Sequence, residues 1–362
     1  MTTSVTDASA VAGVTPPPGV DRVWYTRCPV PTASGLALNL GWLASGFAGH
    51  GLDVGVLQDA PPEIAAHHFD HRLRGLFREG GSVPALAARS EGAPTRLIGL
   101  TWIDEGQAVL TRPGTGITGP ADLAGRRVAV PGRAATPGRG FPRAMALHGF
   151  AGALALAGLT LDDVRQVEVP AAFEPTVGAD SRVGNWPGLS ALAAGEVDAV
   201  YVKGARAAEE GAAIGAVVAV DLDAVPDRRS RVNNGTPRPI TVHERTLAEN
   251  PGLVTEFLVQ TLRAAAWAAT RPDEVRAVLA AETHSGAAGV DRAYADGFHT
   301  DLAPDLSAER LDLLDRQQRF LHDHGFLAEP VDVHAWAAHE PLAEAHRVLA
   351  AEHAVLPENP TG

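Results

Sequence analysis

The sequence has little cysteine, few aromatic residues and no long apolar run. Its 362 residues include one cysteine, Cys28, which excludes an intrachain disulfide and any multi-cysteine metal site. The fourteen histidines show no HExxH pattern and no zinc-type spacing, so we expect no bound metal. No stretch of about 20 continuous apolar residues is present, so the sequence predicts no membrane-spanning helix.

An excess of basic residues is also missing. The formal net charge is −13, which argues against a general affinity for nucleic acids or anionic membranes, because both require a net basic face. A hydrophobic content of 45% and a charged content of 20% are typical of a globular protein. The length allows two domains. A small anionic substrate in a locally basic pocket remains compatible with this composition.

The N-terminal residues 1–20 are polar and proline-rich, without a basic region followed by an apolar one. They therefore predict a flexible leader rather than a signal peptide. Cys28 follows "WYTR", so it does not follow a hydrophobic segment as a lipoprotein cysteine would. We expect a cytoplasmic protein that acts as a monomer.

Short β-branched runs alternate with longer Ala/Leu-rich runs along the first half of the chain. This alternation predicts a mainly parallel sheet covered by helices. Strands are predicted at Val23–Val30, Leu52–Leu57, Thr95–Trp102, Arg127–Val130, Val164–Pro170, Ala199–Val202 and Gly215–Leu222. Helices are predicted at Gly35–Gly51, Val83–Ala93, Ala146–Leu159, Leu253–Thr270, Pro272–Ala281, Ala308–His324 and Trp336–His353.

The lone cysteine lies in an unusual stretch, "WYTRCPVPTA". Thr26, Arg27 and Cys28 follow one another at the end of a predicted strand, where α/β sheets bind ligands. Pro29 and Pro31 stiffen the segment that follows. An adjacent arginine can lower the pKa of a thiol, which favours a reactive Cys28. The alternative is a buried and inert cysteine, the more frequent role of an isolated one.

A basic stretch, "HHFDHRLRGLFREGG", covers residues 67–81 of this acidic chain. One interpretation is a solvated helix face, with His71, Arg74 and Arg78 spaced by three and four residues. The other is an anion site, in which an arginine fork binds two oxygens and Gly80-Gly81 allows close approach of the backbone. The spacing alone does not decide between them.

The phrases "DLAGRRVAVPG" and "ALAAGEVDAVYV" resemble the type II periplasmic-binding-protein fold, in which two α/β lobes enclose an interlobe cleft. The resemblance implies a flexible leader at residues 1–20, a first lobe from residues 21–110 and 223–362, and a second lobe from residues 111–222. The strands that cross between the lobes are expected near residues 108–111 and 217–223.

A more specific resemblance joins the two stretches. "CPVP", then His68-Phe69, then Arg78-x-Gly80-Gly81, resembles the 2'-hydroxybiphenyl-2-sulfinate desulfinase family, as do "ITGPADLAGRRVAV" and "QQRFLHDHGFLAEPV" further on. The family implies cleavage of an aryl C–S bond to release sulfite, with no metal and no organic cofactor. By this resemblance the catalytic residues are Cys28, His68 and Arg78, and Gly81 binds the substrate.

Two routes are chemically open to Cys28. As a thiol it can protonate the ring carbon that bears sulfur, and as a thiolate it can attack the sulfur atom. Both routes require His68 within hydrogen-bond reach of the cysteine sulfur. Two other functions remain open. The first is a non-catalytic protein that binds small sulfonates or carboxylates, and the second is a decarboxylase, because an arginine fork binds all these anions.

Some residues differ from the family pattern or are candidates for the pocket wall. Arg27 and Lys203 add positive charge, which suggests a smaller or doubly charged organosulfur substrate. Phe69, Phe141 and Trp186 are possible wall residues, although large aromatic side chains are more often ordinary core residues. The complete set of expected substrate-binding residues is Thr26, Arg27, Phe69, Gly80, Gly81, Phe141, Trp186 and Lys203. The loop at residues 231–242 is also expected near the cleft.

Overall fold

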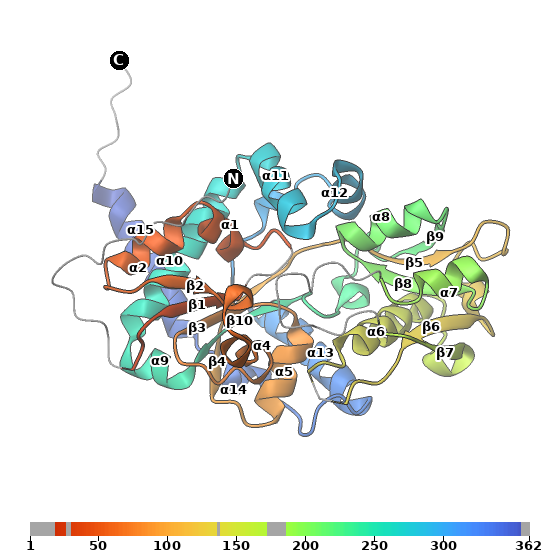
Figure 1. Cartoon of the computed structure of the whole chain (residues 1–362), viewed down its shortest axis with the longest axis horizontal. Helices are drawn as coiled ribbons and strands as arrows, with labels where there is room; N and C mark the ends of the chain where they lie inside the picture. The colour runs from red at the N-terminus through yellow and green to blue at the C-terminus, as the bar shows by residue number, and fades with distance from the viewer. Residues whose placement is uncertain (1–18, 27–29, 136–137, 172–185, 356–362) are drawn as a thin grey trace, which may run out of the picture.

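The structure is a computed structural model, and it describes residues 19–26, 30–135, 138–171 and 186–355. Within them the chain forms two five-stranded sheets with helices packed around each. Figure 1 shows the sheets at opposite ends of the long axis of the molecule. The architecture is therefore α/β with two lobes, as the sequence predicted.

The first sheet has the strand order β2-β1-β3-β10-β4. β1 pairs in parallel with β2 and β3, whereas β10 runs antiparallel to both β3 and β4. β10 enters this sheet after the chain has built the second one, so the first lobe contains two distant parts of the sequence. The strands are β1 (Val23–Thr26), β2 (Val54–Val56), β3 (Leu76–Glu79), β4 (Thr95–Thr101) and β10 (Arg238–His243).

The second sheet has the order β7-β6-β8-β5-β9. β6 is parallel to β7 and β8, and β5 is antiparallel to β8 and β9. The two segments expected to cross between the lobes correspond to β5 and β9, which pair with each other within this sheet. The chain itself passes from one sheet to the other at residues 102–106 and 222–237. The strands are β5 (Gln107–Thr111), β6 (Arg127–Pro131), β7 (Arg165–Val169), β8 (Ala199–Lys203) and β9 (Val217–Asp221).

Helices cover both sheets, and the C-terminal ones belong mainly to the first lobe (Figure 1). The helices before β10 are α1 (Ala33–Asn39), α2 (Trp42–Ala48), α3 (Pro62–Ala65), α4 (His67–Asp70), α5 (Ser82–Ser90), α6 (Phe141–Ala155), α7 (Leu189–Ala194) and α8 (Ala205–Ala213). Those after it are α9 (Glu244–Glu249), α10 (Pro251–Ala268), α11 (Pro272–Thr283), α12 (Ala287–Ala293), α13 (Ala308–Asp323), α14 (Val333–Trp336) and α15 (His339–Val355).

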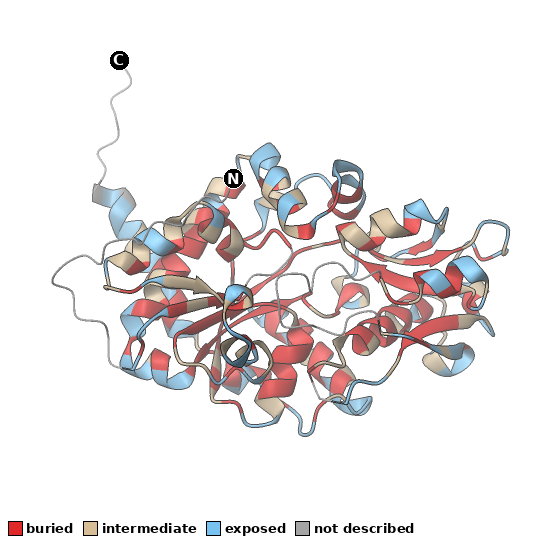
Figure 2. Cartoon of the chain, in the orientation of Figure 1, coloured by how far each residue is buried: buried red, intermediate tan, exposed pale blue. Residues whose placement is uncertain are grey.

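The first-lobe core forms where α10 packs on the sheet. Phe77 of β3 stacks on Phe257 of α10 with ring centroids 4.5 Å apart, and both side chains are fully buried. Figure 2 shows buried residues along the strands and on the inner faces of the helices. Phe320 of α13 packs against the apolar cluster of the second lobe, so this C-terminal helix contacts both cores. Burial of these aromatic side chains is the main stabilising contribution here.

Three sequence-based predictions of secondary structure need correction. The helix predicted at 35–51 is two helices, because Gly41 adopts a positive φ of 75° between α1 and α2. The last predicted helix begins at His339 rather than Trp336, which ends α14. β3 was not predicted, because its sequence "LFRE" carries little of the β-branched or alternating pattern typical of strands.

Candidate active site

The ends of β1 and β3 bring two of the predicted site residues together. Thr26, the last residue of β1, pairs in register with Arg78 of β3. Both side chains are buried, each with about 1% of its surface exposed. The Arg78 guanidinium donates from Nη1 to the Gly81 carbonyl at 3.2 Å and from Nε to the His68 carbonyl at 3.4 Å. These carbonyls hold the guanidinium at the carboxyl end of the sheet.

The basic stretch before Arg78 is not a helix face, so that interpretation is wrong. α4 ends at Asp70, His71 adopts a left-handed φ of 54°, and the chain then enters β3. This turn buries His71 and brings the His68 carbonyl to Arg78. The neighbouring His67 instead pairs with Asp70 at the surface, at 2.7 Å.

Several polar atoms around Arg78 have no hydrogen-bond partner among the described residues. They are the Thr26 hydroxyl oxygen, His68 Nδ1 and both ring nitrogens of His71. Buried polar groups are nearly always paired, so each unpaired group is costly unless something else satisfies it. Such atoms gathered around one arginine indicate a ligand site.

The two histidines beside Arg78 are neutral at pH 7. Burial, Arg78 and Arg139 together lower the pKa of His68 to about 3. Burial and then Arg78 also lower the pKa of His71 well below its usual value, despite the nearby His68 carbonyl. A neutral imidazole can donate one hydrogen bond and accept another, so His68 can hold a substrate or a thiol without adding charge.

Gly80 and Gly81 are required for close packing. The Gly80 N–H donates to the Pro239 carbonyl at 3.3 Å, and a Cβ on Gly80 would lie 2.9 Å from the Arg78 guanidinium. A Cβ on Gly81 would lie 2.3 Å from Asn234 Oδ1, which accepts from the Val83 N–H at 2.9 Å. Gly81 therefore allows Asn234 to cap α5.

Asn234 was not singled out from the sequence, although its loop was expected near the cleft. The preceding Asn233 is fully buried and donates to the Met145 carbonyl at 3.1 Å and to the Tyr201 hydroxyl at 2.9 Å. This loop therefore connects α5 of the first lobe with α6 and β8 of the second. A double Asn followed by Gly235 was the available signal, because such residues favour turns and local capping.

The predicted wall residues lie in different surroundings. Phe69 is half-buried beside His68, edge to face at 4.8 Å, with Arg139 over its ring. Phe141 begins α6 and packs against the apolar clusters of both lobes. The Trp186 indole donates to the Tyr201 carbonyl at 2.7 Å and packs on the second-lobe core.

Lys203, the only lysine of the sequence, lies in a separate buried cluster at the junction of the lobes. Its ammonium pairs with Glu105 and donates to Thr236 Oγ1 at 2.8 Å, and Arg238 contacts the same Glu105 oxygen at 3.0 Å. Less than a tenth of each charged side chain is exposed. The structure thus places Lys203 in an internal ion cluster rather than beside Arg78.

Glu79 points away from Arg78 into a saturated polar network. Its carboxylate accepts hydrogen bonds from Ser34 and, at 2.7 Å, from Thr101, and Ser34 also meets the Tyr25 hydroxyl at 3.0 Å. Burial raises the pKa of Glu79, while the hydroxyl donors oppose that rise. The network ties β1, β3 and β4 together and fixes the strand that carries Arg78.

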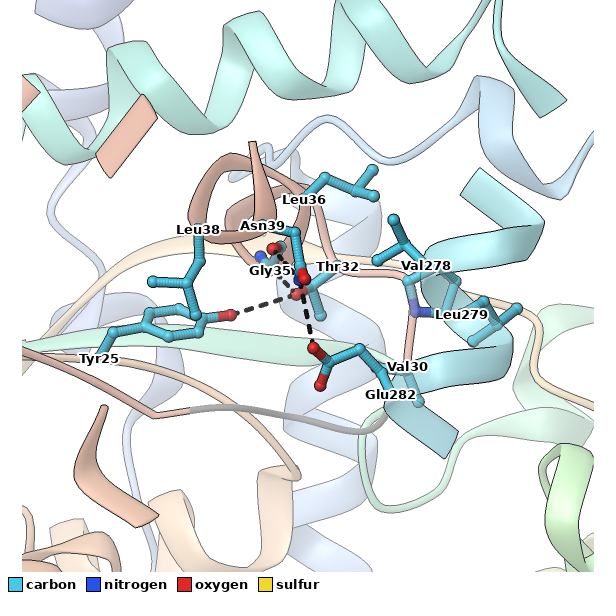
Figure 3. A pocket seen from close by; sticks show the side chains of 11 residues that line it. Tyr25, Val30, Thr32, Gly35, Leu36, Leu38, Asn39, Val278, Leu279 and Glu282 are labelled. Carbon is cyan, nitrogen blue, oxygen red and sulfur yellow. Dashed lines mark hydrogen bonds between the residues drawn. The ribbon is translucent and has the colours of Figure 1, made fainter. Parts of the chain in front are cut away.

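A small pocket lies between α1 and α11, and Tyr25 and residues 30–32 also line it. Figure 3 shows the Tyr25 hydroxyl directed at Thr32, and Asn39 donating to Glu282 at 3.2 Å across the pocket. Thr26, His68 and Arg78 do not line it. It is therefore distinct from the polar cluster around Arg78.

Arg27 and Cys28 lie outside the described residues, so their predicted roles rest on the sequence. Cys28 is two residues beyond Thr26, where β1 ends. Within the described part of the chain, no group of three or more His, Cys, Asp or Glu side chains could hold a metal ion. Across the same residues, no helix combines the length and apolar character that crossing a membrane requires.

The fold and the basic polar cluster define a two-lobed protein of the type II periplasmic-binding-protein-like class. The aliphatic sulphonate binding protein SsuA of Escherichia coli shares this fold, with a TM-score of 0.62 and 16% identity over 89% of this chain and 92% of SsuA. The model of the NMT1/THI5-like family matches residues 36–177.

Closer relatives identify the family. The 2'-hydroxybiphenyl-2-sulfinate desulfinase of Rhodococcus erythropolis is 32% identical over 352 residues, 89% of this chain and 93% of the relative. The chain belongs to this desulfinase family. The crystal structure of a cysteine-to-serine variant of the desulfurization enzyme DSZB with biphenyl-2-sulfinic acid has a TM-score of 0.72 and 27% identity. It covers 91% of this chain and 99% of that one.

Proposed function

We propose that the protein is a cofactor-free desulfinase that cleaves the C–S bond of an aromatic sulfinate and releases sulfite. The observation that carries this proposal is the buried Arg78, flanked by Thr26 and the two neutral histidines with unsatisfied polar atoms. Membership of the desulfinase family supports it, as does the related structure with a bound sulfinic acid.

Arg78 is the proposed sulfinate-binding group. A sulfinate carries two oxygens on one sulfur, and a guanidinium can donate to both in a planar fork. The Thr26 hydroxyl and the neutral imidazole of His68 supply further hydrogen bonds. Phe69 offers a face for the arene beside His68.

The chemical step requires one proton at the ring carbon and one water at sulfur. We propose that the Cys28 thiol gives its proton to this carbon while the C–S bond breaks and its electron pair stays with the ring. The SO2 released then adds water to form bisulfite and a proton, and that proton returns to Cys28. The sum is ArSO2− + H2O → ArH + HSO3−, which needs no oxidant or reductant.

The low pKa of His68 argues against a thiolate–imidazolium pair at this site. A thiolate paired with an imidazolium requires a protonated His68, and burial with the two arginines lowers the pKa of His68 to about 3. We propose that Cys28 acts as a thiol and that neutral His68 positions its S–H group. We further propose that the enzyme is a cytoplasmic monomer.

The test is sulfite release from a panel of sulfinates, including biphenyl-2-sulfinate and benzenesulfinate. We expect turnover by the wild type and a loss of at least about a thousandfold in Cys28→Ser and Cys28→Ala. His68→Gln should lose about a hundredfold, whereas the matched control His67→Gln should stay near the wild-type rate.

Two other outcomes would replace the proposal. Calorimetry that shows tight binding of sulfinates without sulfite release would indicate a binding protein. Release of carbon dioxide from the matching carboxylates, without sulfite, would indicate a decarboxylase. An unchanged rate in Cys28→Ala would contradict the assigned role of the cysteine.

A further inference from the structure

Arg139 is a second cation beside the proposed sulfinate site. It immediately precedes α6 in the second lobe, and its guanidinium lies over the Phe69 ring at 4.6 Å from the centroid. The Phe69 ring meets the His68 ring edge to face with the centroids 4.8 Å apart, and the His68 carbonyl accepts a hydrogen bond from Arg78. An arginine from each lobe thus lies close to His68 and Phe69.

Within the described ranges, Arg139 lacks the carboxylate partner that several other cations of the molecule have. Arg143 lies 3.4 Å from Glu168, and Lys203 and Arg238 share Glu105. Among the residues that the structure describes, Arg139 has no carboxylate within ion-pair distance, although the chain has 43 acidic residues. A guanidinium stacked on an aromatic ring keeps its N–H edge available for an anion in the ring plane.

The surroundings of Arg139 add positive potential. The first turn of α6 contains no acidic side chain, and its N-cap Gly140 provides no side-chain hydrogen bond. The positive end of this fifteen-residue helix therefore adds to the charge of Arg139. Arg78 and Arg139 both lower the pKa of His68, which indicates that the two cations act at the same place.

We propose that Arg139 binds a second anionic group of the substrate, so that the preferred substrates are arene sulfinates that also carry a carboxylate. The inference rests on the proposed desulfinase function and specifies its substrate class. The sulfinate occupies Arg78, the ring lies along Phe69, and the carboxylate reaches Arg139. Arg139 is a specificity-determining residue in this arrangement and takes no part in breaking the C–S bond.

The experiment compares ortho-, meta- and para-carboxybenzenesulfinate with the matching carboxamides, which have nearly the same shape and one charge less. For the wild type we expect kcat/KM of at least one isomer to exceed that of its carboxamide by about tenfold. In Arg139→Gln this ratio should fall to about one, with an intermediate ratio in Arg139→Lys. The matched control Arg133→Gln removes an exposed charge from the same segment and should keep the wild-type ratio.

The ratio is measured within each variant, so a fraction of misfolded protein does not change it. A wild type that turns over carboxylates and carboxamides equally, or an Arg139→Gln variant that keeps the preference, would overturn the proposal. An equal loss in Arg133→Gln would assign the effect to general charge and would overturn it as well.

Calorimetry with the unreactive carboxybenzenesulfonates and their carboxamides measures binding without turnover. It therefore tests the Arg139 subsite separately from the desulfinase function. A tenfold binding preference that depends on Arg139, without sulfite release from any sulfinate, would contradict only the desulfinase function. Sulfite release with no binding preference would contradict only the Arg139 subsite.

Discussion

Two buried cationic clusters of this protein differ in how their polar atoms are satisfied. At the junction of the lobes, Lys203 and Arg238 share the Glu105 carboxylate, and Thr236 accepts a further hydrogen bond from Lys203. At the end of the first sheet, the Arg78 guanidinium contacts main-chain carbonyls, and polar atoms of Thr26 and His68 lack partners among the described residues.

The difference separates a structural cluster from a binding site. A buried charge that meets its counter-charge inside the protein is satisfied in the free state, and an added anion would compete with Glu105. Neutral polar groups at a buried arginine that lack partners among the described residues are available to a ligand. By this criterion we propose Arg78, rather than Lys203, as the anion-binding residue.

The largest expected effect comes from Lys203→Met. It leaves Arg238 as the remaining partner of Glu105 in this cluster, and we expect the free energy of unfolding to fall by about 3–5 kcal/mol. Urea unfolding measures this loss, and KM for a sulfinate below the unfolding temperature should stay within about twofold. A stable variant with a strongly raised KM would instead place Lys203 in substrate binding, as the sequence suggested.

Arg78→Lys tests the other cluster. A lysine keeps the charge but loses the planar fork, so we expect kcat/KM for sulfinates to fall about hundredfold. The measurement is sulfite release, with circular dichroism as a check on folding. Activity within threefold of the wild type would show that two-oxygen recognition by Arg78 is not needed.

A pair of histidines extends the comparison to pH. His148 of α6 stacks on Phe320 of α13 at 3.9 Å and has a hydrogen-bond partner in Gln317 at 2.7 Å, whereas His68 Nδ1 has none in the described chain. Burial lowers the pKa of His148 to about 3, and that of His68 is about 3 as well. Between that pH and the unfolded pKa of about 6.5, the unfolded chain binds more protons, so stability falls as the pH falls.

We therefore expect His148 to contribute a slope of up to about 1.4 kcal/mol per pH unit below pH 6.5. Urea unfolding of the wild type and His148→Gln at pH 7 and pH 5 measures it, and the variant should lose less stability on acidification. The contribution of His68 should shrink when a sulfinate binds, because the anion offsets Arg78. Equal pH slopes for the wild type and His148→Gln would contradict the assignment.

The smallest effects come from two hydroxyl deletions on the first sheet. Ser34→Ala removes a donor to the buried Glu79 and should lower the free energy of unfolding by about 1–3 kcal/mol with little change in kcat/KM. Thr26→Val removes an unsatisfied hydroxyl, so stability should stay within about 0.5 kcal/mol while kcat/KM falls about tenfold. A Ser34→Ala variant with reduced kcat/KM and a Thr26→Val variant with reduced stability would instead place Ser34 at the substrate and give Thr26 a structural role.

The sequence predicted much of the architecture because most strands carry apolar β-branched runs and most helices carry apolar periodicity. It missed β3, whose burial comes from its neighbours β1 and β10 rather than from its own pattern. The helix at 35–51 was predicted as continuous because apolar spacing persists through the turn at Gly41. Tertiary context decided the first case, and the left-handed backbone of Gly41 decided the second.

The candidate site was predictable only in part. Spacing alone did not distinguish His68 from His67, and the choice came from the family resemblance; the structure places His67 at the surface with Asp70. Lys203 was expected near the substrate because it departs from the family pattern and adds charge. Its partner Glu105 lies 98 residues away, so the local sequence does not show the ion pair. Arg139 reaches the site through the packing of the second lobe, and Asn234 reaches it through the loop that returns to the first lobe. Local sequence does not reveal either contact.

The most direct test of the central claim is a crystal structure of the Cys28→Ser variant with benzenesulfinate. We predict that both sulfinate oxygens accept hydrogen bonds from the Arg78 guanidinium, with the ring carbon that bears sulfur facing the serine hydroxyl and His68. A sulfinate bound at the Lys203 and Arg238 cluster instead, with Arg78 untouched, would contradict the account.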